Sequence, residues 1–373
     1  MINRLEKAIQ PGKVVVLYGP RRSGKTTLLK EIIGKMDKNN YLLVEGDQLK
    51  YREFLSSQDS RKLKDLVEDK KLLVIDEAQR LPEIGLNLKI LVDNFPKIAV
   101  LATGSASLDL AGKISEPLTG RSKMYMLYPL SFAELANWLG KFEAKNRLEQ
   151  WLIYGSYPEV VTIEGKNKRE EHLDWLISNY LYKDLLNFGG IKKPDKIVNL
   201  LRLLAFQIGG EVSIAELGSN LALDRVTVEK YLDLLEKSFV IFKVYGFSRN
   251  LRKEIVKTSR YYFFDNGVRN ALIENFNVLK LRNDIGQLWE NFLAVERRKY
   301  HQYRGIRTNS YFWRTYDQKE IDLIEERGGK LYGFEFKWGK GKVKLPKDFL
   351  ETYSNSEFKI INKENYLDFL GVK

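Results

Sequence analysis

A glycine-rich segment near the N-terminus combines residue types that bind phosphate. Gly19–Thr26 reads GPRRSGKT and matches the pattern GxxxxGK[ST] throughout. It lies between an expected strand, Val14–Tyr18, and an expected helix, Thr26–Met36, so backbone N–H groups and the start of the helix would face one anion. Lys25 is then expected to reach the β- and γ-phosphates of a nucleotide, and Thr26 to offer its hydroxyl to Mg²⁺. The segment predicts binding of ATP with magnesium.

The same argument gives a set of nucleotide-contacting positions. Arg21 and Arg22 lie inside the loop but also fit ordinary surface charge. The expected contacts are Gly19, Pro20, Arg21, Arg22, Ser23, Gly24, Lys25, Thr26 and Thr27.

A pair of acids ends the next strongly apolar run. Lys71–Glu77 reads KLLVIDE, in which four apolar residues precede Asp76 and Glu77. A buried strand, Leu72–Ile75, would deliver Asp76 to the carboxyl edge of the sheet, beside the phosphates, where it can hold the magnesium shell. Glu77 is then placed to orient or deprotonate the attacking water. Taken alone such a pair is typical of a solvated strand end, but after a phosphate loop it predicts ATP hydrolysis.

Three further residues are candidates for the same site. The expected strand Ile98–Ala102 ends in Thr103 and Ser105, whose hydroxyls would emerge near the γ-phosphate. Arg121, in the sequence LTGR, is a candidate for stabilising charge on the transferred phosphoryl group. A surface arginine in a loop is an equally good interpretation of Arg121.

A second constellation of charged residues lies near the C-terminus. Glu290 falls on an expected helix, Asp322 in KEIDLI, and Glu335 and Lys337 in YGFEFKW. Residues two apart on a strand point to one face, so Glu335 and Lys337 can share a site. A half-buried strand that alternates Phe with charged residues would look the same.

Composition bounds the remaining possibilities. The chain has 373 residues and a formal net charge of +13, which favours a polyanionic partner without proving one. It contains no cysteine and two histidines, so disulfides, thiolate sites and multi-histidine zinc sites are excluded. No apolar run is long enough for a membrane span and the first residues do not resemble a signal peptide, so we expect a cytoplasmic protein.

The spacing of apolar runs predicts how these residues are positioned. Residues 13 to about 105 alternate strands, among them Tyr41–Glu45, with helices such as Asp59–Glu68, which predicts a parallel sheet covered on both faces. The fold class is therefore α/β, a P-loop NTPase sheet followed by a helical segment, a winged helix and an α+β part. The expected domains are 1–135 (ATPase), 136–190 (helical lid or linker), 191–265 (winged helix-turn-helix) and 266–373 (the α+β part).

The third of these parts has the order of a winged helix. Lys196–Ile208 has helical periodicity, Ser213 begins a second helix, and Asp224 is a candidate cap for a third. Two strand-like runs follow, Phe239–Tyr245 and Arg260–Phe264. Phosphate or groove contacts to DNA are expected from Arg225, Thr227 and Lys230 on the third helix and from Arg249, Arg252, Lys253 and Lys257 between the strands.

Several of these segments together resemble a known family. GPRRSGKTTLL, LLVIDEAQR, the TGS segment, LTGR and YPLSFAEL look like the archaeal and bacterial AAA-plus-type ATPases that carry a C-terminal winged helix and a restriction-endonuclease-like domain of unknown function. The resemblance implies that Asp76 and Glu77 are the Walker B acids. It also implies a sensor role for Thr103 or Ser105 and a finger-like role for Arg121.

The C-terminal constellation in turn resembles the PD-(D/E)xK nuclease core. This resemblance implies that Asp322 and Glu335 bridge Mg²⁺, with Glu290 and Lys337 completing the site. Domains of this fold also occur without cleavage activity, since fold does not fix function.

Three functions remain open. One is an ATPase whose nucleotide state acts on C-terminal domains that contact DNA. The second is an ATP-regulated, metal-dependent nuclease, and the third is a nucleotide-dependent scaffold whose winged helix binds a protein. An arginine finger working on a neighbouring copy would imply a homo-oligomer.

Overall fold

The computed structural model describes the whole chain apart from residues 106–117, 182–192, 249–258, 316–318, 340–344 and 373. It divides into two compact units. The first comprises Met1–Pro129 with Lys237–Phe239, and the second comprises Leu130–Glu236 with Val240–Lys373.

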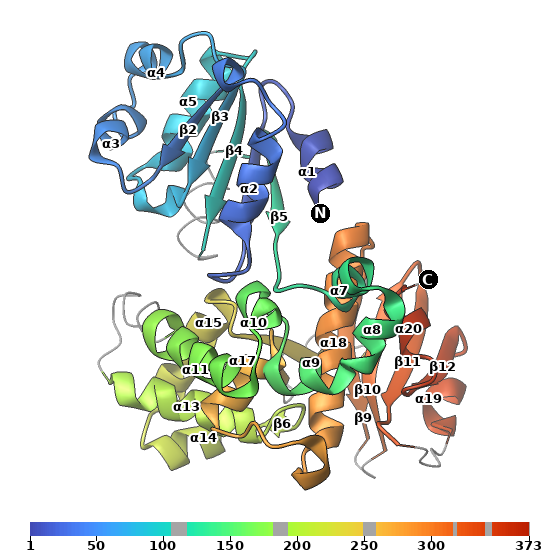
Figure 1. Cartoon of the computed structure of the whole chain (residues 1–373). Coiled ribbons are helices and arrows are strands. Elements are labelled where there is room, and N and C mark those ends of the chain that lie inside the picture. Colours follow the sequence, from blue (N-terminus) through green and yellow to red (C-terminus); the bar gives the residue numbers. More distant parts are fainter. Residues whose placement is uncertain (106–117, 182–192, 249–258, 316–318, 340–344, 373) are drawn as a thin grey trace. The chain divides into compact units, whose positions relative to one another are not determined.

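The first unit is a five-stranded parallel sheet with the strand order β2-β3-β4-β1-β5 (Figure 1). Its strands are β1 (Val14–Tyr18), β2 (Tyr41–Glu45), β3 (Leu72–Asp76), β4 (Ala99–Gly104) and β5 (Ser122–Met126). Its helices are α1 (Ile2–Ala8), α2 (Lys25–Ile33), η1 (Lys38–Asn40), α3 (Leu49–Leu55), α4 (Ser60–Val67), η2 (Ala78–Arg80) and α5 (Ile84–Asn94).

Both faces of this sheet are buried, as the near-continuous apolar runs predict. Side chains alternate along β1, so Val14 and Val16 pack in one core with residues of α3, α4 and α5, whereas Val15 and Leu17 pack in the other with α1 and α2. The parallel sheet with helices on both faces is the α/β fold of P-loop NTPases. Strand β4 lies between β1 and β3, so the ends of these three strands meet at one edge.

The second unit begins with helices and ends with a mixed sheet. The helices before this sheet are α7 (Phe132–Leu139), α8 (Lys141–Asn146), α9 (Leu148–Tyr154), α10 (Pro158–Thr162), α11 (Lys166–Leu176) and the π-helical turn η3 (Ile177–Leu181). Ser131 begins α7 with a reciprocal capping box to Glu134.

A three-helix and three-strand group follows. It contains α13 (Pro194–Phe206), β6 (Glu211–Val212), α14 (Ile214–Leu221), α15 (Arg225–Lys237), β7 (Ile241–Gly246) and β8 (Ser259–Phe263). The caps expected from the sequence are present: the Ser213 side chain accepts from the Glu216 N–H, and the Asp224 side chain accepts from the Thr227 N–H. The strands are antiparallel in the order β6-β8-β7.

The last part carries the longest helix. Its elements are α17 (Asn266–Leu272), η4 (Leu279–Leu281), α18 (Ile285–Arg304), β9 (Asn309–Arg314), β10 (Glu320–Arg327), β11 (Lys330–Phe336), α19 (Lys347–Thr352), β12 (Ser356–Ile361) and α20 (Tyr366–Phe369). Strand β7 pairs in parallel with β9 through Tyr245–Tyr311 and Gly246–Phe312. One seven-stranded sheet, β12-β11-β10-β9-β7-β8-β6, therefore runs across the domain boundary expected at residues 265 and 266.

Candidate functional site

The loop between β1 and α2 has a backbone that only glycine adopts easily. Gly24, which begins α2, has φ +95°, and Gly19 has φ +151°. A Cβ atom on Gly19 would lie 2.1 Å from the carbonyl oxygen of Leu127, just after β5. Both glycines of the motif are therefore required by the fold itself, and the loop curls at the carboxyl end of β1.

Lys25 places its charge inside this loop. Its Nζ donates to the carbonyl oxygens of Gly19 at 3.1 Å and Pro20 at 2.7 Å, and the residue is 6% exposed. The two carbonyls accept from the ammonium group inside the loop, which places a positive charge where a phosphate would bind.

The ends of α2, β3 and β4 meet around the Asp76 carboxylate. Thr26 Oγ1 donates to Asp76 Oδ2 at 2.8 Å, so the two residues expected to hold magnesium are in contact. The hydroxyl of Thr103, which is fully buried, donates to Asp76 Oδ1 and accepts from the Glu77 backbone N–H at 3.1 Å. Thr103 thus holds the Asp76 carboxylate and the Glu77 backbone at once.

Glu77 is held by a residue that the sequence motifs did not single out. The Glu77 backbone is left-handed, with φ +57°, so the chain leaves the direction of strand β3 at this residue. The Gln79 amide donates to Glu77 Oε2 at 2.6 Å and to Ser105 Oγ at 3.1 Å. Gln79 follows the acid pair in a polar stretch, and nothing in its spacing indicates this bridge.

These residues fit a magnesium-bound nucleotide. Among the described residues, the buried Ser23 hydroxyl in the loop has no hydrogen-bond partner, which a phosphate oxygen would provide. Thr26 and Asp76 offer the oxygen ligands that Mg²⁺ prefers. Over the same residues no group of three or more His, Asp or Glu side chains is arranged to hold a metal by itself, so phosphate oxygens would have to complete the coordination.

Arg121 does not join this site in its own chain. It precedes β5, and its carbonyl accepts from the Val14 N–H at the amino end of β1, whereas the phosphate loop follows the carboxyl end of β1. Five strand residues separate the two ends, about 16 Å. Arg121 Nε instead donates to Asp93 Oδ1 at 2.5 Å. The structure therefore does not bring Arg121 to the phosphate loop of its own chain, and action on a neighbouring copy stays a prediction.

The four C-terminal residues do converge. Asp322 on β10 and Glu335 on β11 are buried, Glu290 on α18 is partly buried beside them, and Lys337 Nζ lies 2.7 Å from Glu335 Oε1. Asp322 Oδ2 accepts from the Phe336 N–H at 2.8 Å. Glu335 Oε2 has no hydrogen-bond partner among the residues that the structure describes.

Strand β8 contributes two further residues to this cluster that sequence reasoning did not assign to it. Tyr262 Oη donates to Glu290 Oε1 at 2.6 Å. Arg260 directs Nη1 towards Glu290 Oε1 at 3.6 Å and Asp322 Oδ1 at 3.8 Å. No pattern around Arg260 indicates this, because its partners come from elements far along the chain.

Burial changes the proton affinity of these groups. It raises the pKa of Glu290 to about 7, against the opposing effect of Arg260. Burial, with the carboxylates of Glu290 and Glu335, also holds the pKa of Asp322 well above its usual range. Burial disfavours the charged form of Lys337, but its contact with Glu335 outweighs this and raises the Lys337 pKa.

The residues expected to contact DNA are only partly described. On α15, Arg225 Nε donates to Glu229 Oε1 at 2.9 Å and the Thr227 hydroxyl donates to Asp224 Oδ2 at 2.6 Å. Lys230 also lies on α15, in an exposed position. The remaining expected contacts, Arg249, Arg252, Lys253 and Lys257, lie outside the described residues.

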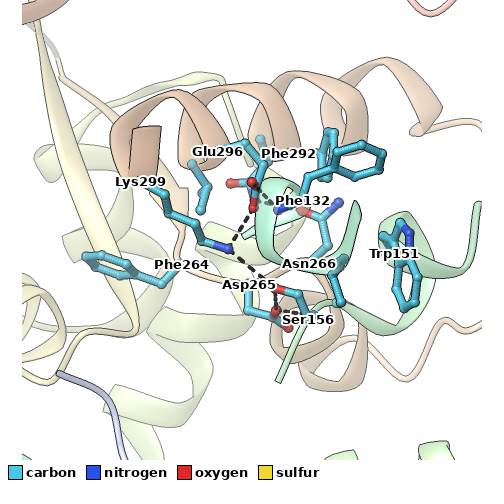
Figure 2. A pocket seen from close by; sticks show the side chains of 13 residues that line it. Phe132, Trp151, Ser156, Phe264, Asp265, Asn266, Phe292, Glu296 and Lys299 are labelled. Carbon is cyan, nitrogen blue, oxygen red and sulfur yellow. Dashed lines mark hydrogen bonds and ion pairs between the residues drawn. The ribbon is translucent and has the colours of Figure 1, made fainter. Parts of the chain in front are cut away.

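A pocket in the second unit contains hydrogen bonds between the start of that unit, at Leu130 and Phe132, and helix α18 (Figure 2). Lys299 Nζ donates to Glu296 Oε1 at 2.7 Å, to the Leu130 carbonyl at 3.0 Å and to Ser156 Oγ at 3.3 Å. Glu296 Oε2 accepts from the Phe132 N–H at 2.6 Å. Because these groups satisfy one another, the pocket is a structural clamp.

Within the described ranges, no helix has the length and apolar character needed to cross a membrane.

Comparison with family models divides the chain into three consecutive matches. They are an AAA domain over residues 11–136, a domain of unknown function (DUF8612) over residues 145–279 and a domain of unknown function (DUF4143) over residues 285–367.

Similar proteins occur in bacteria and archaea. Uncharacterized proteins of Mycobacterium tuberculosis and Mycobacterium bovis are each 30% identical to this chain over 341 residues, which is 90% of this chain and 72% of the relative. An uncharacterized protein of Methanocaldococcus jannaschii is 25% identical over 361 residues, covering 87% of this chain and 75% of the relative.

Two solved structures are more distant. One is a signal-transduction ATPase with numerous domains and a tetratricopeptide-repeat sensor from Pyrococcus horikoshii, with 14% identity and a TM-score of 0.31 over 81% of this chain and 47% of that chain. The other is a Pif1 helicase from Bacteroides, with 15% identity and a TM-score of 0.24 over 51% and 57%. This chain thus spans about half the length of each, and TM-scores this low do not establish a common fold.

Proposed function

The chain belongs to the family that includes the two mycobacterial relatives, and from this premise we propose that it binds ATP with Mg²⁺ and hydrolyses it. The observation that carries the proposal is the contact between Thr26 Oγ1 and Asp76 Oδ2, with Thr103 fixing Asp76 and Glu77 together. The match of residues 11–136 to an AAA domain supports it.

Each residue has a defined part in this function. Lys25 and the loop N–H groups bind the phosphates, and Thr26 and Asp76 hold Mg²⁺, which supplies positive charge to the phosphate oxygens. The Glu77 carboxylate orients the attacking water and takes its proton while the bond from the water oxygen to the γ-phosphorus forms and the bond from that phosphorus to the β–γ bridging oxygen breaks, which releases ADP and phosphate. Gln79 and Thr103 position Glu77, and Ser105 positions Gln79.

The first experiment compares Mg²⁺-ATP turnover and ATP binding in three variants. Lys25→Ala removes the charge inside the loop, so we expect loss of binding and turnover. Glu77→Gln keeps the shape of the side chain, so binding should persist while turnover falls by about 10² or more. Lys30→Ala, an exposed residue on the same helix α2, is the matched control. Binding without turnover in the unmodified chain would contradict hydrolysis.

We further propose that the second unit contacts DNA and that nucleotide state acts on it. The order of α13, α14 and α15 and the antiparallel β6-β8-β7 arrangement agree with a winged helix, and the net charge of +13 favours a polyanion. The exposed Arg225–Glu229 ion pair is a weak obstacle, since such pairs contribute about 0.3–0.5 kcal/mol.

Duplex DNA added to the turnover assay tests this second proposal. Stimulation that weakens steeply with salt is expected for phosphate contacts. Arg225→Ala together with Lys230→Ala should reduce it, whereas Lys30→Ala should not. A rate of ATP turnover that is the same with and without DNA would favour a protein partner for the winged helix. That alternative is supported by two large apolar side chains, Val226 on α15 at 73% exposure and Phe206 on α13 at 68%.

A further inference from the structure

The acidic cluster of α18, β10 and β11 already contains a cation supplied by the chain. We propose that the Arg260 guanidinium takes the place of a divalent metal ion there, so that the cluster binds neither Mg²⁺ nor Mn²⁺ and does not cleave DNA. The inference concerns the second unit and is independent of ATP hydrolysis.

Distances place Arg260 among the carboxylates. Its Nη2 donates to Glu320 Oε2 at 2.8 Å, while its Nη1 lies 3.6 Å from Glu290 Oε1 and 3.8 Å from Asp322 Oδ1. These are acids from two separate elements, α18 and β10. A guanidinium is charged at every accessible pH, so the cluster holds this positive charge permanently.

The position of Arg260 is fixed by the sheet. Strand β8 lies between β6 and β7, with Arg260 opposite Glu211 on one side and Val244 on the other. The guanidinium carbon lies 4.6 Å from the centre of the Phe312 ring, and the residue is 4% exposed. The ladders fix the Arg260 backbone, and the Phe312 ring together with Glu320 holds the guanidinium beside the acids.

The resident charge excludes a metal ion by repulsion and by occupying the ligands. Mg²⁺ needs oxygen ligands at about 2.0–2.1 Å around one point. Glu290 and Asp322 would have to turn towards that point while remaining within reach of Arg260, and like charges at such separations repel strongly in a buried site.

The same geometry shows which carboxylates would lose their positive partner if Arg260 were replaced. Glu290 Oε1 and Asp322 Oδ1 would lose their cation, and Glu335 Oε2 has no hydrogen-bond partner among the described residues. The carboxylates of α18, β10 and β11 would then be free to turn towards one hard ion. The proposal therefore predicts a latent metal site that appears when the guanidinium is replaced by a neutral group.

Mn²⁺ binding to the full-length, nucleotide-free chain tests this directly, measured by electron paramagnetic resonance with thermal unfolding as a second readout. Every protein carries Asp76→Asn so that the phosphate loop does not contribute. With Arg260 present we expect no bound Mn²⁺ that depends on Asp322. Arg260→Gln should bind one Mn²⁺ per chain, at least about tenfold more tightly than the chain that keeps Arg260. Adding Asp322→Asn to Arg260→Gln should abolish this binding.

Two controls separate charge from structure. Arg260→Lys keeps a cation and should gain no site. Arg314→Gln removes an arginine of the same sheet that pairs with Glu211 at 2.7 Å, and should also gain none. Mn²⁺ should raise the unfolding midpoint of Arg260→Gln and of no other variant.

Three results would overturn the proposal. One is Mn²⁺ bound by the Arg260-containing chain and lost on Asp322→Asn, which requires no Arg260 variant to fold. The second is an Arg260→Gln chain that neither binds Mn²⁺ nor is stabilised by it. The third is metal-dependent DNA cleavage by the Arg260-containing chain that Glu335→Ala abolishes.

Discussion

Replacement of Thr103 by Val removes one buried hydroxyl and leaves the volume of the side chain almost unchanged. That hydroxyl donates to the Asp76 carboxylate and accepts from the Glu77 N–H. A hydrogen bond to a charged group contributes about 1.5–3 kcal/mol, and a neutral one about 1 kcal/mol. We therefore expect the free energy of unfolding of the first unit to fall by about 2–4 kcal/mol.

The effect on turnover is separate from the effect on stability. Glu77 would lose the partner of its backbone N–H, so its carboxylate would no longer be fixed relative to the water it deprotonates. We expect kcat to fall about 10- to 100-fold, which corresponds to about 1.4–2.7 kcal/mol of transition-state stabilisation. ATP affinity should change little, because Lys25 and the loop are untouched.

The assay pairs steady-state turnover and nucleotide binding with chemical unfolding, at a temperature where every variant is folded. Thr103→Ser keeps the hydroxyl and loses a methyl group, so it should retain turnover and lose only about 1 kcal/mol of stability. If Thr103→Val is destabilised but turns over as the wild type does, the idea that Thr103 positions Glu77 is refuted.

Three further predictions concern other residues. Gln79→Ala should lower turnover about tenfold with unchanged ATP binding, because the Glu77 carboxylate loses its amide donor; equal rates would show that the amide does not position it. Burial lowers the pKa of His301 to about 4 in the folded chain, against about 6.5 in the unfolded chain. Between these two pH values the unfolded chain binds more protons than the folded chain, so the free energy of unfolding should fall as the pH is lowered through this range. Unfolding measured against pH should show a flatter dependence in His301→Gln than in His172→Gln, and identical curves would contradict the assignment. Arg121→Ala should lower turnover only under conditions where light scattering shows oligomers with ATP, and unchanged turnover in such oligomers would exclude a finger role.

The nucleotide site was largely predictable because its parts are local in sequence. The phosphate loop is a run of consecutive residues between a strand and a helix, and Asp76 follows a strand directly. Thr103 could be placed because parallel strands end at a common edge. Gln79 could not, since its role depends on the left-handed turn at Glu77, which the sequence does not indicate.

Sequence reasoning did not foresee positions that depend on the order and direction of strands. Arg121 precedes β5, a strand with mixed polar and apolar residues that gave no clear signal, and therefore lies at the amino edge of the sheet. Arg260 lies on the second strand expected for the winged helix, but its proximity to acids of α18 and β10 was not expected, because it depends on the pairing of β7 with β9. Such contacts join segments far apart in sequence, and no local pattern encodes them.

The hydrogen bond between the start of α7 and α18 also determines the order in which the two units can fold during synthesis. All five strands of the first unit lie before Pro129, so its sheet can form early on the ribosome. The Phe132 N–H, by contrast, has its partner only after Glu296, 164 residues later in the chain, has been synthesised. At about 5–20 residues per second this interval is roughly 8–33 s. Throughout this interval the Phe132 N–H lacks its Glu296 partner, so the second unit completes its folding well after all five strands of the first have been made.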